Sequence, residues 1–311
     1  MKTIALCLAV FCFAEVFSSE VSPLPEFSYQ KGNLQEIAKA AREIGAFAIK
    51  DLPNAESYFE SLEKLKQEAP SCFDKESLDT ATVVLNDNVV RTTSAVASNL
   101  DSSFHPSCLD VAPIEAAFDA AKAFVNILIQ TENEGSIPKF FSGQKEKSLK
   151  EAEYLDHIHV YSPAKTENPN FKFTAPFHID NGLFLLLTPS PENPLIVKDA
   201  NGRDYSAGNG EVIVVFGRGL NQWLFQERSS KLRNKFRAAP HAVKAVTSER
   251  VVMARMIVVD GNAVPKNEKG QVFASPILLI FNFDKLFLQD ENVQRNVLQS
   301  EGGLCSLQRN R

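Results

Sequence analysis

In the first half of the chain, apolar residues recur every three or four positions, which is the spacing of helices with one buried face. The first such stretch ends at Gly45, and Asn54 precedes the second as a favoured helix N-cap. Short apolar runs at 46–49 and 82–85 predict strands between them. The predicted helices cover residues 33–44, 54–67 and 111–130.

After about residue 154 the pattern changes to short apolar runs separated by glycine, asparagine and proline. Asn201-Gly202 stands between two of these runs and is a strong hairpin signal. Many short strands with such turns favour a sandwich or jelly roll. The predicted strands cover residues 158–161, 183–187, 195–197, 212–216, 251–259 and 277–283.

The two patterns together predict an α+β fold that is mainly β. A helical supporting region is expected over residues 20–150 and a β core over 151–311, packed as one structural unit. The 311 residues are 44% hydrophobic and 23% charged, which excludes a mainly disordered chain. The net charge of −5, without long runs of lysine or arginine, argues against nucleic acid as a partner.

Residues 1–19 differ in kind from the rest. Lys2 is followed by an apolar run to Phe17, interrupted only by Glu15, and then by the small pair Ser18-Ser19. This pattern predicts a secretory signal peptide removed near Ser19, and hence a secreted protein. The alternative is a buried first helix. The run is too short to span a bilayer, so a membrane anchor is not expected.

The cysteines fit an oxidising compartment. With the signal peptide removed, Cys72, Cys108 and Cys305 remain, an odd number that leaves at least one thiol free or paired outside the chain. Secretion favours a bridge between Cys72 and Cys108, although spacing alone fixes no geometry.

The triplet His178-Ile179-Asp180 offers the clearest chemistry. On a strand, residues two apart point to the same side, so an imidazole and a carboxylate converge. His241, in the same β-rich half, could join them from a neighbouring strand. Two imidazoles and one carboxylate form the facial triad of non-haem Fe(II) oxygenases, with positions left open for other ligands. Either histidine alone would more often be structural.

Arg250 opens the apolar strand that follows His241. A guanidinium binds a carboxylate with two parallel hydrogen bonds, so Arg250 is the candidate for the far carboxylate of an oxo acid. Arg255 competes, but strand alternation places it on the face opposite Arg250.

Several segments around these residues resemble the isopenicillin N synthase-like family of Fe(II)/2-oxoglutarate dioxygenases. Residues 25–47 resemble the family's N-terminal domain, whereas 51–150 and the chain after 260 match weakly. The segments that carry the resemblance of the β core are 176–187 (PFHIDNGLFLLL), 210–217 (GEVIVVFG), 236–243 (FRAAPHAV) and 248–250 (SER).

The resemblance implies a double-stranded β-helix (jelly roll) with helical N-terminal support. It also implies that His178, Asp180 and His241 bind Fe(II), that Arg250 binds 2-oxoglutarate as co-substrate, and that ascorbate can be needed as reductant. We therefore expect an oxidoreductase, a secreted dioxygenase that hydroxylates or desaturates a small molecule. Its substrate and oligomeric state do not follow from the sequence.

The chain departs from the family pattern at three places. Val252 replaces a serine that donates a hydrogen bond to the co-substrate, which removes about 1 kcal/mol or somewhat more. Arg218 replaces an aspartate, and residues 157–163 (HIHVYSP) replace an Asn-Tyr-Tyr-Pro segment. Iron binding is therefore better supported than use of 2-oxoglutarate.

The altered segment holds further candidates. A hydroxyl from Tyr161 or Ser162 could compensate for Val252. His157 and His159 share a strand face and could line the cavity, bind the oxo acid or simply pack; a second metal site is disfavoured because no glutamate follows at the spacing such sites need.

Two alternative functions stay open. One is an Fe(II) oxidase that takes all four electrons for O₂ from its substrate and uses no oxo acid. The other is a catalytically silent secreted binding protein on the same fold. Iron-dependent release of succinate separates both from a 2-oxoglutarate dioxygenase.

Overall fold

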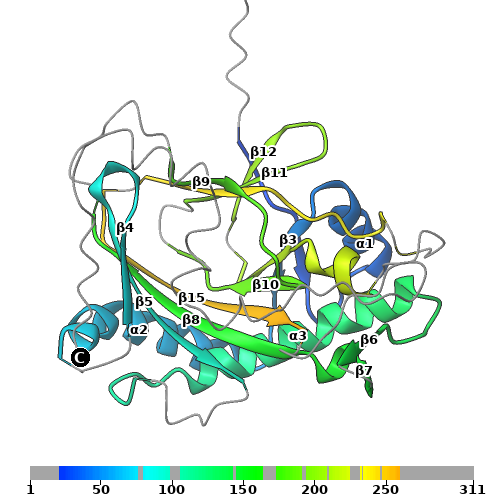
Figure 1. Ribbon diagram of the computed structural model, residues 1–311, viewed down its shortest axis with the longest axis horizontal. Helices are drawn as coiled ribbons and strands as arrows, with labels where there is room; N and C mark the ends of the chain where they lie inside the picture. Colours follow the sequence, from blue (N-terminus) through cyan, green and yellow to red (C-terminus); the bar gives the residue numbers. More distant parts are fainter. Residues whose placement is uncertain are drawn as a thin grey trace, which may run out of the picture.

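The computed structural model describes residues 21–75, 80–98, 106–142, 145–163, 173–190, 194–208, 210–224, 232, 234–245 and 247–259 (Figure 1). The predicted signal peptide, Cys305 and the predicted strand at 277–283 lie outside these residues. No helix in the described part of the chain is long and apolar enough to cross a membrane.

Within these ranges the helices are α1 (Leu34–Glu43), α2 (Ala55–Lys75) and α3 (Ala112–Glu132). Short helical turns cover Asn86–Asn88, Leu149–Glu151 and Leu220–Leu224. The strands are β1 (Ser22–Pro23), β2 (Glu26–Ser28), β3 (Ala46–Lys50), β4 (Thr80–Val84), β5 (Val90–Ala97), β6 (Lys139–Ser142), β7 (Lys145–Ser148), β8 (Glu153–Tyr161), β9 (Phe173–His178), β10 (Phe184–Leu187), β11 (Leu195–Lys198), β12 (Asp204–Ser206), β13 (Val212–Phe216), β14 (His241–Lys244) and β15 (Arg250–Val258).

Two sheets form the core of the fold. The large sheet has eight strands in the order β2-β3-β13-β10-β15-β8-β5-β4, and the small sheet has five in the order β1-β12-β11-β14-β9. Figure 1 shows β9, β11 and β12 above the large sheet and α2 and α3 below it. The large sheet thus lies between the helices and the small sheet, as in the jelly roll with helical support that the sequence predicts.

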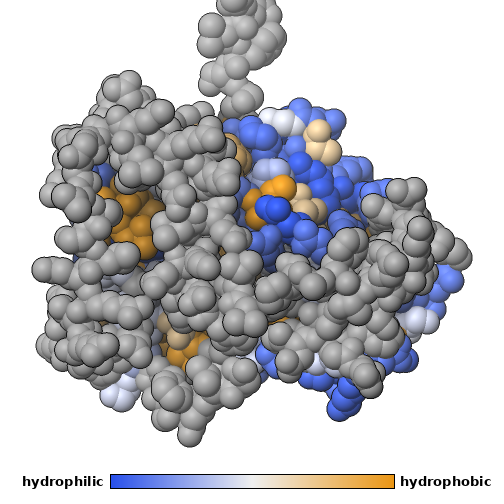
Figure 2. All heavy atoms as spheres, in the orientation of Figure 1, coloured by the Kyte–Doolittle hydropathy of each residue, from blue (hydrophilic) through white to orange (hydrophobic). Residues whose placement is uncertain are grey.

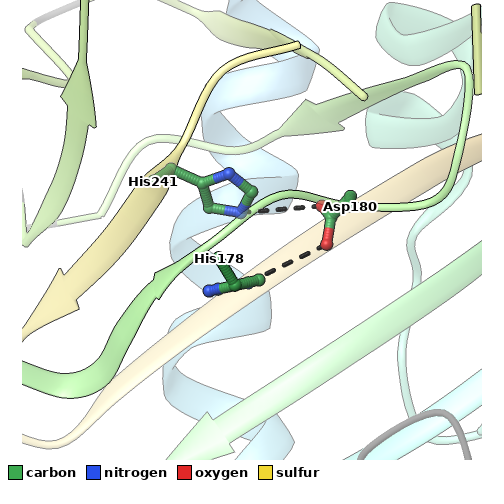
Figure 3. Close-up of side chains that lie close together, drawn as sticks. All are labelled: His178, Asp180 and His241. Carbon is green, nitrogen blue, oxygen red and sulfur yellow. Dashed lines mark ion pairs between the residues drawn. The ribbon is translucent and has the colours of Figure 1, made fainter. Parts of the chain in front are cut away.

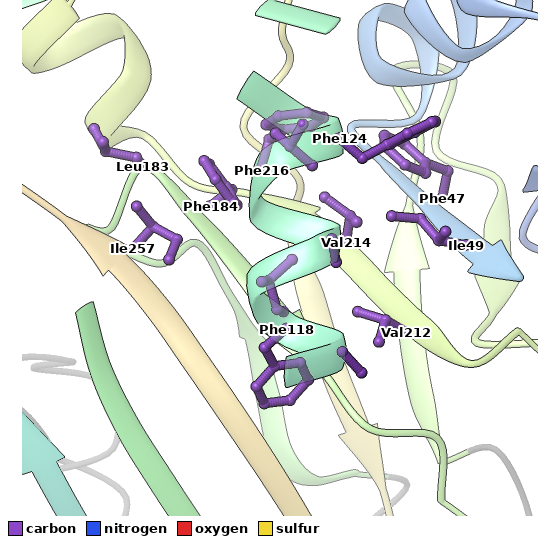
Figure 4. Packing of buried hydrophobic residues seen from close by; sticks show 14 of the residues in the cluster. Phe47, Ile49, Phe118, Phe124, Leu183, Phe184, Val212, Val214, Phe216 and Ile257 are labelled. Carbon is purple, nitrogen blue, oxygen red and sulfur yellow. The ribbon is translucent and has the colours of Figure 1, made fainter. Parts of the chain in front are cut away.

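The large sheet is buried on both faces, and strand alternation divides its side chains between two cores. One face carries Phe47, Phe184 and Phe216, which belong to one cluster with Phe118, Phe124 and other apolar side chains of α3 (Figure 4). The opposite face packs against the small sheet. That second cluster includes Ala46, Leu185, Ile213, Val215 and Ala254 from the large sheet and Val197 from the small one.

The described surface over α1 and its surroundings is mainly polar. The space-filling view shows mainly hydrophilic side chains over α1 and the β11–β12 hairpin (Figure 2). That hairpin turns at the predicted Asn201-Gly202, where Gly202 has a φ of +81° that favours glycine.

The helices follow their apolar spacing, with one change of length. Asn33 caps α1 by accepting a hydrogen bond from the Gln35 N–H at 3.0 Å. α2 continues past the predicted end at residue 67, through Pro70, because Ala69 and Cys72 extend its buried face. Cys72 forms the expected disulfide with Cys108, at a Cα–Cα distance of 6.0 Å, which ties the end of α2 to the segment before α3.

β5 is the main element that the pattern analysis missed. Its sequence, VRTTSAVA, carries no apolar run, and it forms because both edges pair with neighbours, β4 on one side and β8 on the other. With β2, β3 and β4, it adds strands from the predicted N-terminal region to the large sheet. The predicted domain boundary near residue 150 stays a prediction.

A buried ion pair joins the centre of the large sheet to α3. Two guanidinium nitrogens of Arg255 donate to the two carboxylate oxygens of Asp156, each at 2.7 Å, and both side chains are 1% exposed. The third nitrogen donates to Asp119 of α3 at 2.6 Å, and the guanidinium stacks on Tyr154. Arg255 therefore faces the helices, opposite to Arg250, as strand alternation predicts.

We expect Asp156→Asn to destabilise the fold by about 3–5 kcal/mol, because it leaves the buried Arg255 charge without its bidentate partner. The double variant Arg255→Met/Asp156→Leu should recover much of that loss, since no charge stays buried. Urea unfolding followed by circular dichroism measures both. The control Lys139→Met breaks an exposed pair with Glu146 and should cost less than about 1 kcal/mol. An Asp156→Asn cost no larger than the control would contradict a structural role for the pair.

Candidate metal centre

The two candidate histidines come from neighbouring strands of the small sheet. His178 ends β9 and His241 begins β14, and the antiparallel register pairs them directly. Directly paired residues point to the same face of a sheet, and their ring centroids lie 4.3 Å apart. Val197, which pairs with His241 on the next strand, packs in the core between the sheets. Both imidazoles therefore point toward the large sheet.

Asp180 completes the group from the turn that follows β9 (Figure 3). Its carboxylate oxygens lie 3.8 Å from His178 Nε2 and 3.6 Å from His241 Nε2. One ligand atom from each residue lies within 4.8 Å of the others. The structure thus brings His178, Asp180 and His241 around one point, as their spacing in the sequence predicts.

The backbone sets which ring nitrogen of each histidine faces that point. His178 Nδ1 lies 2.8 Å from the Pro176 carbonyl, and His241 Nδ1 lies 3.2 Å from the Ala239 carbonyl. Because a carbonyl can only accept, each Nδ1 carries a proton, and Nε2 is the nitrogen through which the neutral ring can bind a metal. A metal-ligating histidine is commonly oriented in this way through its other nitrogen.

The group is buried on one side and open on the other. The side chains of His241, Asp180 and His178 are 5%, 18% and 39% exposed. Burial lowers the pKa of His241 below its usual value, against the opposite effect of the Asp180 carboxylate. His241 is therefore neutral at physiological pH, which is the form that binds a metal.

The turn that carries Asp180 is held by the end of β13. Arg218 donates from its backbone N–H to the Asp180 carbonyl and from Nη2 to the Ile179 carbonyl, both at 2.9 Å. The flanking Gly217 and Gly219 approach so closely that a Cβ on either would lie 2.2 or 2.6 Å from the Gly182 carbonyl oxygen. Arg218, noted from the sequence only as a departure, thus fixes the backbone beside the carboxylate.

Arg250 lies on the face of the large sheet that looks toward the small sheet. It pairs directly with Tyr161 of β8, and its guanidinium carbon lies 3.7 Å from the centre of the tyrosine ring. Arg250 is 6% exposed. Val252 is on the same face, opposite His159, and supplies no hydrogen bond there.

Ser162 follows directly after β8. Its hydroxyl accepts a hydrogen bond from the Val90 N–H at 2.8 Å, and its own N–H donates to the Val90 carbonyl. Ser162 therefore closes the end of the β5–β8 ladder, and its predicted role beside Arg250 stays a prediction.

The same face carries two polar residues that sequence reasoning missed. Arg91 pairs with Tyr161 from the side opposite to Arg250, and Thr93 pairs with His159. They were missed because β5 was not recognised as a strand. The period-two spacing of Arg91, Thr93 and Ala95 would have placed all three on one face if it had been.

The arrangement can bind a divalent metal. Two neutral imidazoles and a carboxylate suit iron and related ions, and three protein ligands leave coordination positions for small molecules. One open side gives those molecules access. The buried guanidinium of Arg250, on the face of the large sheet that looks toward the small sheet, suits a carboxylate.

Neither a family model nor a curated protein sequence matches the chain. Solved structures do match. They include AtDAO1, a dioxygenase for auxin oxidation from Arabidopsis thaliana in a binary complex with 2-oxoglutarate, at 13% identity, 76% coverage of this chain, 93% of that chain and a TM-score of 0.54. JOX2 in complex with 2OG, Fe and JA matches at 11%, with 83% of each chain covered and a TM-score of 0.55.

The dioxygenase for auxin oxidation from rice matches at 13% identity, covering 89% of this chain and 95% of that chain, with a TM-score of 0.52. The chain thus shares its fold, over most of its length, with 2-oxoglutarate and Fe(II) oxygenases. The predicted jelly-roll fold is confirmed.

We expect His178→Ala and His241→Ala each to abolish stoichiometric binding of Mn(II), a divalent probe, because each removes a ligand atom held by the backbone. Asp180→Ala should keep weaker binding through the two imidazoles. Isothermal titration calorimetry measures the affinities. Asp204→Asn, which changes a carboxylate paired with Lys198 on the same sheet, is the control and should bind normally. Equal affinities in all variants would rule out a metal at this site.

Proposed function

We propose that the protein is a non-haem Fe(II)- and 2-oxoglutarate-dependent dioxygenase that oxidises a small organic molecule. One observation carries the proposal: His178, Asp180 and His241 converge, with Nδ1 of each histidine on a backbone carbonyl and Nε2 turned toward Asp180. The fold supports it, because structures that share this fold are described as complexes with 2-oxoglutarate, and one of them with Fe.

The donor set fits Fe(II). Bound there, the metal would keep open positions for a chelating oxo acid and for O₂; oxidative decarboxylation of the oxo acid would supply two of the four electrons that O₂ accepts, and the substrate the other two. Ascorbate, if needed, would keep the iron reduced. The two imidazoles and Asp180 would hold the metal, and Arg218 holds the backbone around Asp180.

Arg250 binds the far carboxylate of 2-oxoglutarate in this proposal. Its guanidinium is buried, where a charge-assisted hydrogen bond is stronger than in water, and the Tyr161 ring beneath fixes its plane. Val252 leaves this subsite one hydrogen bond short. The hydroxyls proposed to compensate are those of Tyr161 and of Ser162, whose oxygen accepts from the Val90 N–H and keeps its own O–H to donate.

Anaerobic titration of the Fe(II)-loaded protein with 2-oxoglutarate tests the function and the role of Arg250. Wild type should develop the visible charge-transfer band of an iron-bound oxo acid and release succinate in air. Arg250→Met should weaken 2-oxoglutarate binding about 30-fold, or ~2 kcal/mol, with unchanged metal affinity. Arg250→Lys should recover part of the loss, because a point charge cannot bind both oxygens.

Three results would contradict this proposal in different ways. A wild type that binds Fe(II) without 2-oxoglutarate, yet consumes O₂ with a substrate, would be an oxidase. A wild type that binds neither would be a silent binding protein. Normal 2-oxoglutarate affinity in Arg250→Met would move the carboxylate subsite elsewhere.

Secretion is part of the same proposal. The pattern of residues 1–19 supports it, and so does the Cys72–Cys108 disulfide, since such bridges persist in oxidising compartments. A secreted enzyme of this kind would have to obtain reduced iron outside the cytosol.

We expect the protein isolated from the medium of expressing cells to begin at or near Glu20. N-terminal sequencing measures this directly, and a variant with Leu8→Arg, which breaks the apolar run, should stay inside the cells. A folded protein that keeps Met1 in the cytosol would overturn secretion without affecting the metal site.

A further inference from the structure

A row of polar side chains crosses the interior face of the large sheet beside the metal centre. We call it the polar wall: Arg91 and Thr93 of β5, His157, His159 and Tyr161 of β8, and Arg250 of β15. The cross-strand registers place these residues on one face. Ala254, which pairs with His157, packs in the core between the two sheets, so this face looks toward the small sheet and its metal ligands.

One ring nitrogen of His159 is used within the wall. Its Nδ1 lies 2.9 Å from the Thr93 hydroxyl. Its ring stacks on His157, with centroids 5.4 Å apart and planes at 12°, and also contacts Tyr161. His159 therefore positions its neighbours.

His157 is different. It is only 6% exposed, yet no hydrogen bond within the described part of the chain reaches its ring nitrogens. Its ring nitrogens are not among the fully buried side-chain atoms without a partner, so they reach accessible space rather than dry core. The residues directly beside it on this face are Ala95 and Ala254, whose side chains are small. His157 thus has an unused donor that small neighbouring side chains leave uncovered.

The charges around His157 indicate which kind of group it would bind. Burial lowers its pKa to about 4, while Asp180 raises and Arg91 lowers it, so both charges lie within electrostatic reach. A divalent metal on the triad would more than balance Asp180. The neutral imidazole would then sit between two positive centres, where its N–H is best matched by an anionic acceptor.

We propose that His157 donates a hydrogen bond to a carboxylate of a ligand bound beside the metal, in the positive field of Arg91. The inference rests on the proposed function only for the metal. The carboxylate could belong to the oxo acid or to the organic substrate, which would then be an organic acid. Both sources share the same chemistry, and the experiment separates them.

Calorimetric titrations of the Mn(II)-loaded full chain test this. The first titrant is 2-oxoglutarate. The second is phenylacetate, added once in the presence and once in the absence of 2-oxoglutarate. Phenylacetamide is the uncharged counterpart of the second probe. His157→Phe keeps the stack on His159 but removes the donor. This variant should bind one of the two carboxylates about tenfold more weakly, or weaker still, with its affinity for Mn(II) unchanged.

Two further variants separate hydrogen bonding from packing. His157→Gln keeps an N–H donor and should recover part of the affinity. His159→Phe makes the same change at the adjacent imidazole and should weaken the affected carboxylate less than His157→Phe does, because Thr93 already occupies one nitrogen of His159.

The outcomes are distinct. Weaker 2-oxoglutarate binding in His157→Phe assigns the contact to the oxo acid. Weaker phenylacetate binding, with no effect on phenylacetamide, assigns it to an acidic substrate. The inference is overturned if His157→Phe binds both carboxylates as wild type does. It is also overturned if wild type does not bind phenylacetate and His157→Phe binds 2-oxoglutarate normally. An equal loss of carboxylate affinity in His159→Phe overturns it as well. Failure of wild type to bind 2-oxoglutarate contradicts the proposed function alone, since phenylacetate without 2-oxoglutarate still tests His157.

Discussion

The bidentate pair between Arg255 and Asp156 is the interaction on which the arrangement of this molecule depends. It lies between β8 and β15 at the centre of the large sheet, where both side chains are 1% exposed. Side chains on a strand alternate, so a slip by one residue would turn every side chain to the opposite face. A slip here would separate two buried charges, which is costly. The pair therefore fixes which residues of β8 and β15 face the metal ligands.

This register separates two sets of polar groups that differ in purpose. On the helix side, Arg255 is surrounded by the carboxylates of Asp156, Asp119 and Glu115, and its charge is used within the fold. On the other side, Arg250 stacks on Tyr161 and faces the interior between the sheets. One strand thus supplies one buried cation to each of the two cores.

The metal centre depends on contacts between the sheets as well as within them. His178 and His241 come from the small sheet, but the backbone around Asp180 is held by Arg218 at the end of β13 in the large sheet. The polar wall lies opposite. Its buried imidazoles make the folded state less stable in acid: the pKa of His157, about 4, is below the 6.5 of an exposed imidazole, so the unfolded chain gains protons first as pH falls from 6.5. A protein that keeps such a cost in its interior has a use for these groups there.

Local patterns determined much of this protein. Alternation alone set Arg250 against Arg255, because the period of two belongs to the strand itself. Asp180 meets His178 as the spacing predicts, but from the turn after β9 rather than from the strand. The apolar run of β13 and the Asn201-Gly202 turn were equally local. Only the tertiary structure decided the rest. β5 is a strand because β4 and β8 pair with its backbone. No apolar run in the sequence therefore predicted that Arg91 and Thr93 face the interior. Ser162 hydrogen-bonds Val90, and His157 lies within electrostatic reach of Asp180 because the two sheets pack together. Contacts between such distant segments leave no periodic signal in either segment.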